Sequence, residues 1–198
     1  MPPKTHRTSV VVIPPPEVWE PIQAIRRQHD RQIHRWMPHV NLLYPFVPRE
    51  QFDLAVPLLT AACQQVSAFD ATLATFRSFT HASGRSTLWL APEPRASFVQ
   101  LQAVLHTAFP AYDDQSRFSG GFTPHLSVGQ VASKRELRSL TATLQAEWQP
   151  LPFPIAAVAL IWREADGPFQ VEHWLSLSHA APCGGKPLAG SQPLAGSK

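Results

Sequence analysis

Apolar residues in this chain occur in short runs and alternations that predict β-strands. Residues 7–13 (RTSVVVI) are rich in β-branched side chains and stop at three consecutive prolines, which is typical of a short buried strand. Residues 69–79 alternate between apolar and polar positions, and a Gly-containing turn leads back into residues 86–90, as in a hairpin. The segments that we predict as strands are residues 7–13, 39–46, 69–79, 86–90, 122–131, 155–162 and 169–177.

Four other segments repeat apolar residues at helical spacing. The clearest is residues 96–109, where Phe98, Leu101 and Leu105 share one face. Ser133 with Glu136 three residues later forms a capping box and predicts the start of another helix. The remaining two are residues 17–29 and residues 50–66, and we expect Pro57 to kink or restart the second of them.

The hairpins imply antiparallel pairing, so the sequence predicts an α+β fold rather than a doubly wound parallel sheet. No glycine-rich phosphate loop is visible in the sequence. We expect one two-lobed domain over residues 1–180. Residues 181–198 repeat the sequence PLAGS and hold no aromatic residue, so we predict a disordered tail.

Composition narrows the class of ligand. The chain has 198 residues, 44% of them apolar, and a formal net charge of +3, which suits a small anionic ligand or a short RNA end better than a long duplex. Cys63 and Cys183 have no spacing typical of a metal site or a disulfide framework. The sequence shows no signal peptide and no apolar stretch long enough for a membrane span, so we expect a soluble cytoplasmic protein, with the nucleus as the alternative compartment. No heptad pattern or long apolar patch is visible, so we also expect a monomer with no obligate protein partner.

One local pattern occurs twice, at residues 38–42 (PHVNL) and residues 124–128 (PHLSV). Each copy has Pro-His at the predicted start of a strand, followed by apolar, polar and apolar residues. Side chains two apart in a strand share a face, so each histidine points the same way as the polar residue after it. We expect the two copies, 86 residues apart, to face each other across a cleft.

This arrangement fits the cleavage of a phosphodiester by acid and base. Imidazole serves both tasks because its ordinary pKa is about 6.5. His39 and His125 are therefore the predicted catalytic residues, and Asn41 and Ser127 the predicted donors to the non-bridging phosphate oxygens. The chemistry needs no metal and no cofactor.

The repeated motif resembles the His-x-Thr/Ser-x signature of the two-histidine phosphoesterases, which include the 2′-5′ RNA ligase-like proteins. Agreement in order and spacing extends over residues 7–178 and includes LWLAPEP, FTPHLSVGQ and WREADGPFQV. The resemblance implies a bilobal fold with pseudo-twofold symmetry, antiparallel sheets lining a central cleft and helices outside. It also implies opening of a 2′,3′-cyclic phosphate to a 2′-phosphate, with His125 as the base and His39 as the acid. Reverse joining of RNA ends through a 2′-5′ linkage is a further implication.

Asn41 departs from the family pattern, which usually has a hydroxyl residue at this position. An amide still donates a hydrogen bond, but it seats a phosphate differently. Three aromatic residues near the motifs, Trp36, Tyr44 and Phe118, are candidates for stacking on a nucleobase, and packing in the core or a loop is the alternative. Arg117, which precedes the second motif, is the predicted arginine contact for the phosphate, with a solvated surface role as its alternative.

Three functions therefore compete. The first is an enzyme acting on RNA ends, and the second is a phosphodiesterase for a small 2′-5′-linked or cyclic nucleotide. The third is a non-catalytic RNA-binding module, for which Asn41 is the only support.

Overall fold

The computed structural model describes residues 3–82, 84–112, 114 and 120–178. The predicted tail, Arg117 and Phe118 lie outside these residues. The strands are β1 (Thr8–Val12), β2 (Val40–Leu43), β3 (Phe69–Thr80), β4 (Ser86–Glu93), β5 (Leu126–Val131), β6 (Leu151–Ile155), β7 (Ala157–Trp162) and β8 (Gln170–Ser176). The helices are α1 (Trp19–His29), α2 (Phe52–Cys63), α3 (Arg95–Ala108) and α4 (Lys134–Glu147), with 3₁₀ turns at Pro16–Val18 and Arg49–Gln51.

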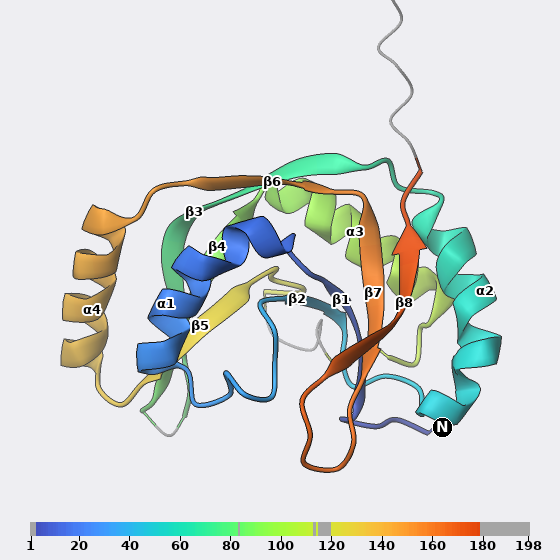
Figure 1. The fold of residues 1–198 in the computed structure, drawn as a ribbon, viewed down its shortest axis with the longest axis horizontal. Coiled ribbons are helices and arrows are strands. Elements are labelled where there is room, and N and C mark those ends of the chain that lie inside the picture. Colours follow the sequence, from blue (N-terminus) through green and yellow to red (C-terminus); the bar gives the residue numbers. More distant parts are fainter. Residues whose placement is uncertain (1–2, 83, 113, 115–119, 179–198) are drawn as a thin grey trace, which may run out of the picture.

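The strands form two antiparallel sheets, which confirms the predicted α+β class. Their strand orders are β2-β1-β7-β8 and β5-β4-β3-β6. The two orders match position by position, so β2 corresponds to β5 and β1 to β4, as in a pseudo-twofold arrangement of two lobes. Both motif strands, β2 and β5, are edge strands, and they lie at the middle of the molecule (Figure 1).

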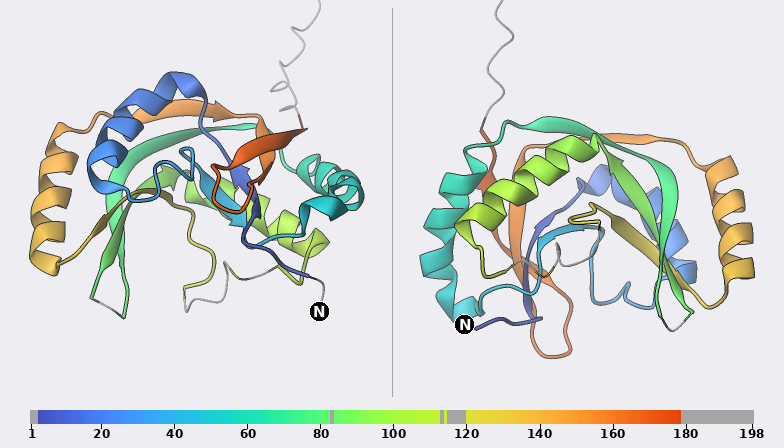
Figure 2. Two further views of the ribbon diagram at one scale, coloured as in Figure 1. Left: turned by 60° about the horizontal axis from the view of Figure 1, so that its bottom comes forward. Right: turned by 180° about the vertical axis from the view of Figure 1, so that it is seen from behind.

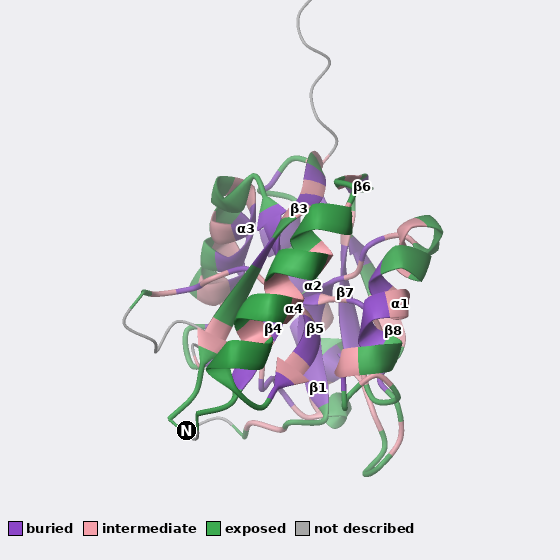
Figure 3. Ribbon diagram, turned by 90° about the vertical axis from the view of Figure 1, so that its left-hand side faces the viewer, coloured by how far each residue is buried: buried purple, intermediate pink, exposed green. Residues whose placement is uncertain are grey.

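Two helices link the lobes because each packs on the sheet of the other half. α1 follows β1 but contacts β5, while α3 follows β4 and contacts both β4 and β2. α2 packs beside α3 and β8 at one end, and α4 covers β3, β4 and β5 at the other (Figure 2). No residue of α4 is fully buried, and its outer face is exposed (Figure 3).

Apolar side chains collect on both sides of the first sheet. The main core gathers alternate residues of the two sheets with the inner faces of the helices, including Val40, Leu42, Leu126 and Val128. A smaller cluster, built from Val11, Ala159, Ile161 and Phe169, lies on the opposite face of the first sheet. The loop side chains of Trp36, Met37 and Tyr44 pack against this smaller cluster. The surroundings of the first motif on this face of the sheet are therefore apolar.

The structure differs from the predicted elements in three respects: where the motif strands begin, how α2 passes Pro57, and the presence of strand β6. The strands of the two motifs begin after their histidines, at Val40 and Leu126. α2 runs through Pro57 without interruption, and both Pro57 and Asp53, whose carbonyl loses its helical partner, are exposed residues. Strand β6 was not predicted, since prolines usually interrupt strands; here it is an edge strand with Pro152 and Pro154 on its exposed face.

Among the described residues, no helix has the length and apolar character that a membrane crossing requires.

Candidate active site

Each motif histidine directly precedes an edge strand, and its ring is fixed by the backbone of its own segment. His39 Nδ1 lies 2.7 Å from the Met37 carbonyl oxygen, and His125 Nδ1 lies 2.8 Å from the Thr123 carbonyl oxygen. A carbonyl oxygen only accepts, so Nδ1 carries the proton in both rings and Nε2 is left for other partners. The two loops before the strands therefore present their histidines in the same way, two residues after the accepting carbonyl.

The first motif continues into a chain of hydrogen bonds. Asn41 Nδ2 donates to His39 Nε2 over 3.0 Å, which places both side chains on the predicted common face of the strand. The amide oxygen of Asn41 accepts from the hydroxyl of Ser9, 2.8 Å away on the neighbouring strand β1. Ser9 Oγ also lies 3.0 Å from the Leu43 carbonyl oxygen, and Ser9 is fully buried.

The second motif opens onto a cavity of about 540 Å³. His125 and Ser127 line it, whereas His39 does not. The other lining residues are mostly hydroxyl-bearing or small: Ser78, Phe79, Thr80, His81, Thr87, Gly121 and Thr123. Phe79 meets the His125 ring edge-on with centroids 5.0 Å apart, and Trp89 lies 5.9 Å away. The cavity thus offers an aromatic wall and several hydroxyl groups beside two imidazoles, those of His125 and His81.

Burial depresses the basicity of both rings. It lowers the pKa of His39 from 6.5 to about 4, opposed by the Met37 carbonyl and reinforced by the charges of Arg26 and His125. Burial also lowers the pKa of His125, against the effect of the Thr123 carbonyl. Imidazoles with pKa values perturbed by burial are typical of acid–base sites.

A buried ion pair supports the loop that carries Trp36. Arg26 and Asp30, both on or next to α1, are almost fully buried and joined by a 2.8 Å contact. A second guanidinium nitrogen of Arg26 donates to the Trp36 carbonyl oxygen over 2.8 Å. The Trp36 ring stacks on His39 with centroids 4.4 Å apart, so Arg26 acts on His39 through Trp36 as well as through its charge.

The comparisons agree with this geometry. The family model described as the 2′-5′ RNA ligase superfamily matches residues 14–167. The chain belongs to this superfamily, one of the two-histidine phosphoesterases. Protein TT0787 of Thermus thermophilus is similar in fold, with a TM-score of 0.61 at 18% identity over 88% of this chain and all of that one. Escherichia coli LigT with 3′-AMP gives a TM-score of 0.55 at 16% identity over 89% of this chain and all of that one. No curated protein matches the chain by sequence.

Two of the predicted stacking residues of this superfamily member, Trp36 and Tyr44, lie in the described part of the chain. Trp36 stacks on Phe169 as well as on His39, with centroids 3.8 Å apart, so a nucleobase would have to displace one of these rings. Tyr44 is half-buried with its ring edge-on to Trp36, and burial raises its pKa. Both aromatic residues lie on the His39 side of the site.

Sequence reasoning missed Ser9, Arg26, Phe79 and Trp89. Phe79 and Trp89 belong to β3 and β4, and Trp89 pairs with Ser127 of the second motif. The strand alternation that places Ser127 therefore also places Trp89 on the cleft face, once the pairing is known. Ser9 had no such signal, because its link to Asn41 depends on the register between β1 and β2.

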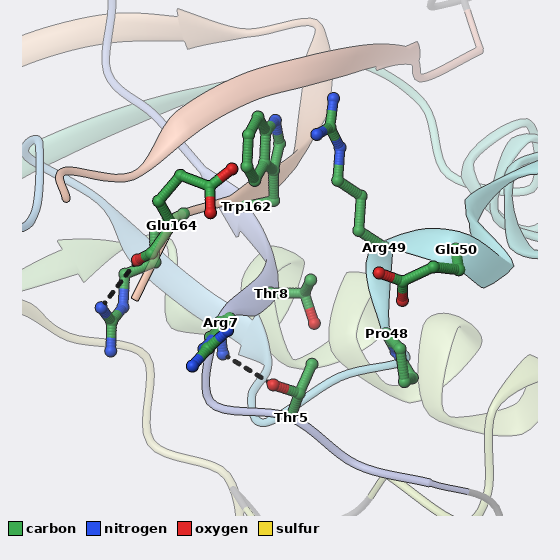
Figure 4. A pocket seen from close by; sticks show the side chains of 9 residues that line it. Thr5, Arg7, Thr8, Pro48, Arg49, Glu50, Trp162 and Glu164 are labelled. Carbon is green, nitrogen blue, oxygen red and sulfur yellow. Dashed lines mark hydrogen bonds between the residues drawn. The ribbon is translucent and has the colours of Figure 1, made fainter. Parts of the chain in front are cut away.

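A second polar pocket of about 250 Å³ lies away from both histidines (Figure 4). Arg49 lies over the Trp162 ring at 3.5 Å and pairs with Glu172, so its guanidinium is already engaged. Glu50 and Glu164 also line this pocket and offset its positive charge. Within the described part of the chain, no group of three or more histidine, cysteine or acidic residues is placed to hold a metal ion.

Proposed function

We propose that this protein opens RNA-terminal 2′,3′-cyclic phosphates to 2′-phosphates by metal-independent acid–base catalysis, with His39 and His125 as the catalytic residues. The observation that carries the proposal is the pair of motifs on corresponding edge strands, each with a histidine held by a carbonyl two residues earlier. One imidazole accepts a proton from the attacking water while the other donates a proton to the leaving 3′-oxygen.

The groups around the two rings support phosphate chemistry. Ser127 and Asn41 place a hydroxyl and an amide beside His125 and His39, where donors to non-bridging oxygens stabilise the charge of the transition state. The cavity at His125 is large enough for a nucleoside, and its hydroxyl groups match the polar edges of a ribose and a base. LigT, a neighbour in fold, binds 3′-AMP in one of its structures, which agrees with a nucleotide-sized ligand. Joining of RNA ends through a 2′-5′ linkage is the reverse of the same step, with a 5′-hydroxyl in place of water.

The test uses a short RNA that ends in a 2′,3′-cyclic phosphate, incubated with the protein in the presence of EDTA. The products are resolved as 2′- and 3′-phosphates. We expect the 2′-phosphate from the wild type, a loss of at least about 100-fold in His39→Ala and in His125→Ala, and unchanged turnover in a control variant of the exposed His34, His34→Ala. Formation of a 3′-phosphate, or turnover that survives both substitutions, would contradict the proposal.

A small nucleotide is the second candidate substrate, favoured by the modest net charge and the uncharged lining of the cavity. Turnover of a mononucleoside cyclic phosphate is compared with that of an oligonucleotide bearing the same end, over a range of salt. A preference for the oligonucleotide that weakens with salt supports RNA, because contacts to backbone phosphates are salt-sensitive. Equal turnover at all salt concentrations supports the small nucleotide. Unchanged activity in both histidine variants would leave the RNA-binding module, and RNA binding without turnover would then be measured directly.

A further inference from the structure

The two motifs differ at the reactive nitrogen of the histidine, Nε2. His39 Nε2 accepts from the amide of Asn41, while its Nδ1–H donates to the Met37 carbonyl oxygen. Both ring nitrogens are therefore occupied in the arrangement that suits the neutral ring. In the second motif the described contact of the ring is from Nδ1 to the Thr123 carbonyl oxygen, and no side chain corresponding to Asn41 is hydrogen-bonded to Nε2 among the described residues. The second motif consequently accommodates a protonated ring without rearrangement, and the first does not.

In the resting arrangement, Ser9 faces the oxygen end of the Asn41 amide. Its buried hydroxyl donates to Asn41 Oδ1 over 2.8 Å, so the NH₂ group of the same amide is turned toward His39 Nε2. A proton on Nε2 would then face another N–H, with no acceptor between the two nitrogens. This conflict opposes protonation of His39 in the resting protein.

We propose that His39 is the proton acceptor and His125 the proton donor of the reaction, and that Ser9 is the positioning residue that fixes this division through Asn41. The proposal rests on the proposed function and reverses the roles that the family resemblance implies. Burial lowers the pKa of both rings; at His39 the charges of Arg26 and His125 lower the pKa further, while the Met37 carbonyl and Asp30 oppose them.

The proposed step balances as follows. The oxygen of a water molecule forms a bond to phosphorus, and one of the water protons passes to His39 Nε2. The bond from phosphorus to the 3′-oxygen breaks, and the 3′-oxygen takes the Nε2 proton of His125, which enters the step as an imidazolium protonated on both nitrogens. The second water proton stays on the product as P–OH. The step leaves His39 protonated and His125 neutral, and exchange with solvent restores both.

The same three residues also accommodate the proton that His39 gains. Ser9 Oγ lies 3.0 Å from the Leu43 carbonyl oxygen, which is a second acceptor for its hydroxyl. Once His39 is protonated, the Asn41 amide turns over, its oxygen accepts from Nε2–H, and its nitrogen donates to Ser9. Ser9 then donates to Leu43, so every donor again meets one acceptor. His39 thus starts without the proton and is able to hold it after the step.

A sulfur leaving atom separates the two roles. The substrate is a 2′,3′-cyclic phosphorothiolate whose 3′ bridging atom is sulfur, compared with the all-oxygen substrate. A thiolate leaves without a proton, so we expect His125→Ala to lose at least about 100-fold on the oxygen substrate and less than about tenfold on the sulfur one. His39→Ala should lose at least about 100-fold on both substrates. The opposite pattern, or equal losses by both variants on both substrates, overturns the division of roles. If the wild type leaves the oxygen substrate untouched, the proposed function itself fails.

Asn41→Asp and Ser9→Ala test the link through Asn41. A carboxylate accepts but does not donate, so Asn41→Asp favours protonated His39 and raises its pKa. We expect the acidic limb of the pH–rate profile to move to higher pH; movement of the alkaline limb instead would make His39 the acid.

Ser9→Ala should lower kcat with little change in KM, on oxygen and sulfur substrates alike, and Ser9→Thr should restore part of kcat. Long-range ¹H–¹⁵N spectra provide an activity-free check, because the wild type should show His39 with its proton on Nδ1 alone. A His39 protonated on Nε2 at neutral pH overturns the proposal.

Discussion

Substitution of Gly129 by alanine tests how closely the two lobes are joined behind the site. Gly129 lies in β5, where α1 of the other lobe ends against it. A Cβ at this position would lie 2.6 Å from His29 Cβ and 3.1 Å from the His29 carbonyl oxygen. Neither contact is with the end of a flexible side chain, so the end of α1 must move away from β5.

That movement would strain the polar contacts around the joint. Gln130 donates to Asp30 over 3.0 Å and accepts from the Arg31 amide over 2.9 Å, while Asp30 holds Arg26. Overpacking of this kind costs about 1 to 3 kcal/mol. In a chain of this size each kcal/mol lowers the melting temperature by about 2 to 4 °C. We therefore expect Gly129→Ala to melt several degrees below the wild type.

The assay is thermal unfolding followed by circular dichroism, with turnover measured at a temperature where both proteins are folded. Gly167→Ala is the matched control, because the nearest atom to its new Cβ is an ordinary 3.6 Å away. Adding His29→Gly to Gly129→Ala removes the closest clash and should recover part of the loss, whereas His29→Ala keeps its Cβ and should not. A Gly129→Ala protein that melts with the wild type would refute the close packing of α1 on β5.

Three further predictions concern the support of the first motif. Arg26→Met leaves Asp30 buried without its partner and should cost about 3 to 5 kcal/mol in denaturant unfolding, and adding Asp30→Leu should recover most of it; additive losses would contradict the pairing. Trp36→Ala removes the ring stacked on His39, a contact of about 0.5 to 1.5 kcal/mol, so kcat should fall by up to about tenfold, whereas Trp36→Phe should keep most of it; equal kcat in both would argue against a role for the stack. Because the pKa of His39 is held at about 4, below its unfolded value near 6.5, its contribution to stability is complete above pH 6.5 and is lost as the pH falls toward 4. Denaturant midpoints measured across that range should fall less in His39→Asn than in the wild type, and parallel curves would contradict the depressed pKa.

The sequence predicted the fold class and the placement of both motifs because each depends on local periodicity. Strand alternation directs Asn41 and Ser127 away from the core and buries Val40, Leu42, Leu126 and Val128, as the structure shows. The sequence did not predict strand β6, because two prolines are tolerated in a strand only at the edge of a sheet. Which strand lies at the edge is a property of the assembled sheet. The same limit applies to Ser9, which contacts Asn41 across 32 residues of sequence. Nothing within either segment indicates that contact.

The long-range contact with Ser9 bears on how the unusual residue Asn41 is interpreted. A single sequence shows an amide where related proteins usually have a hydroxyl, and the amide alone is compatible with altered phosphate seating, altered substrate or lost catalysis. The structure shows the amide turned toward His39 and held there by a buried hydroxyl. Under the proposed division of roles, the Ser9–Asn41 pair is the feature that distinguishes two nearly symmetric motifs in their affinity for a proton.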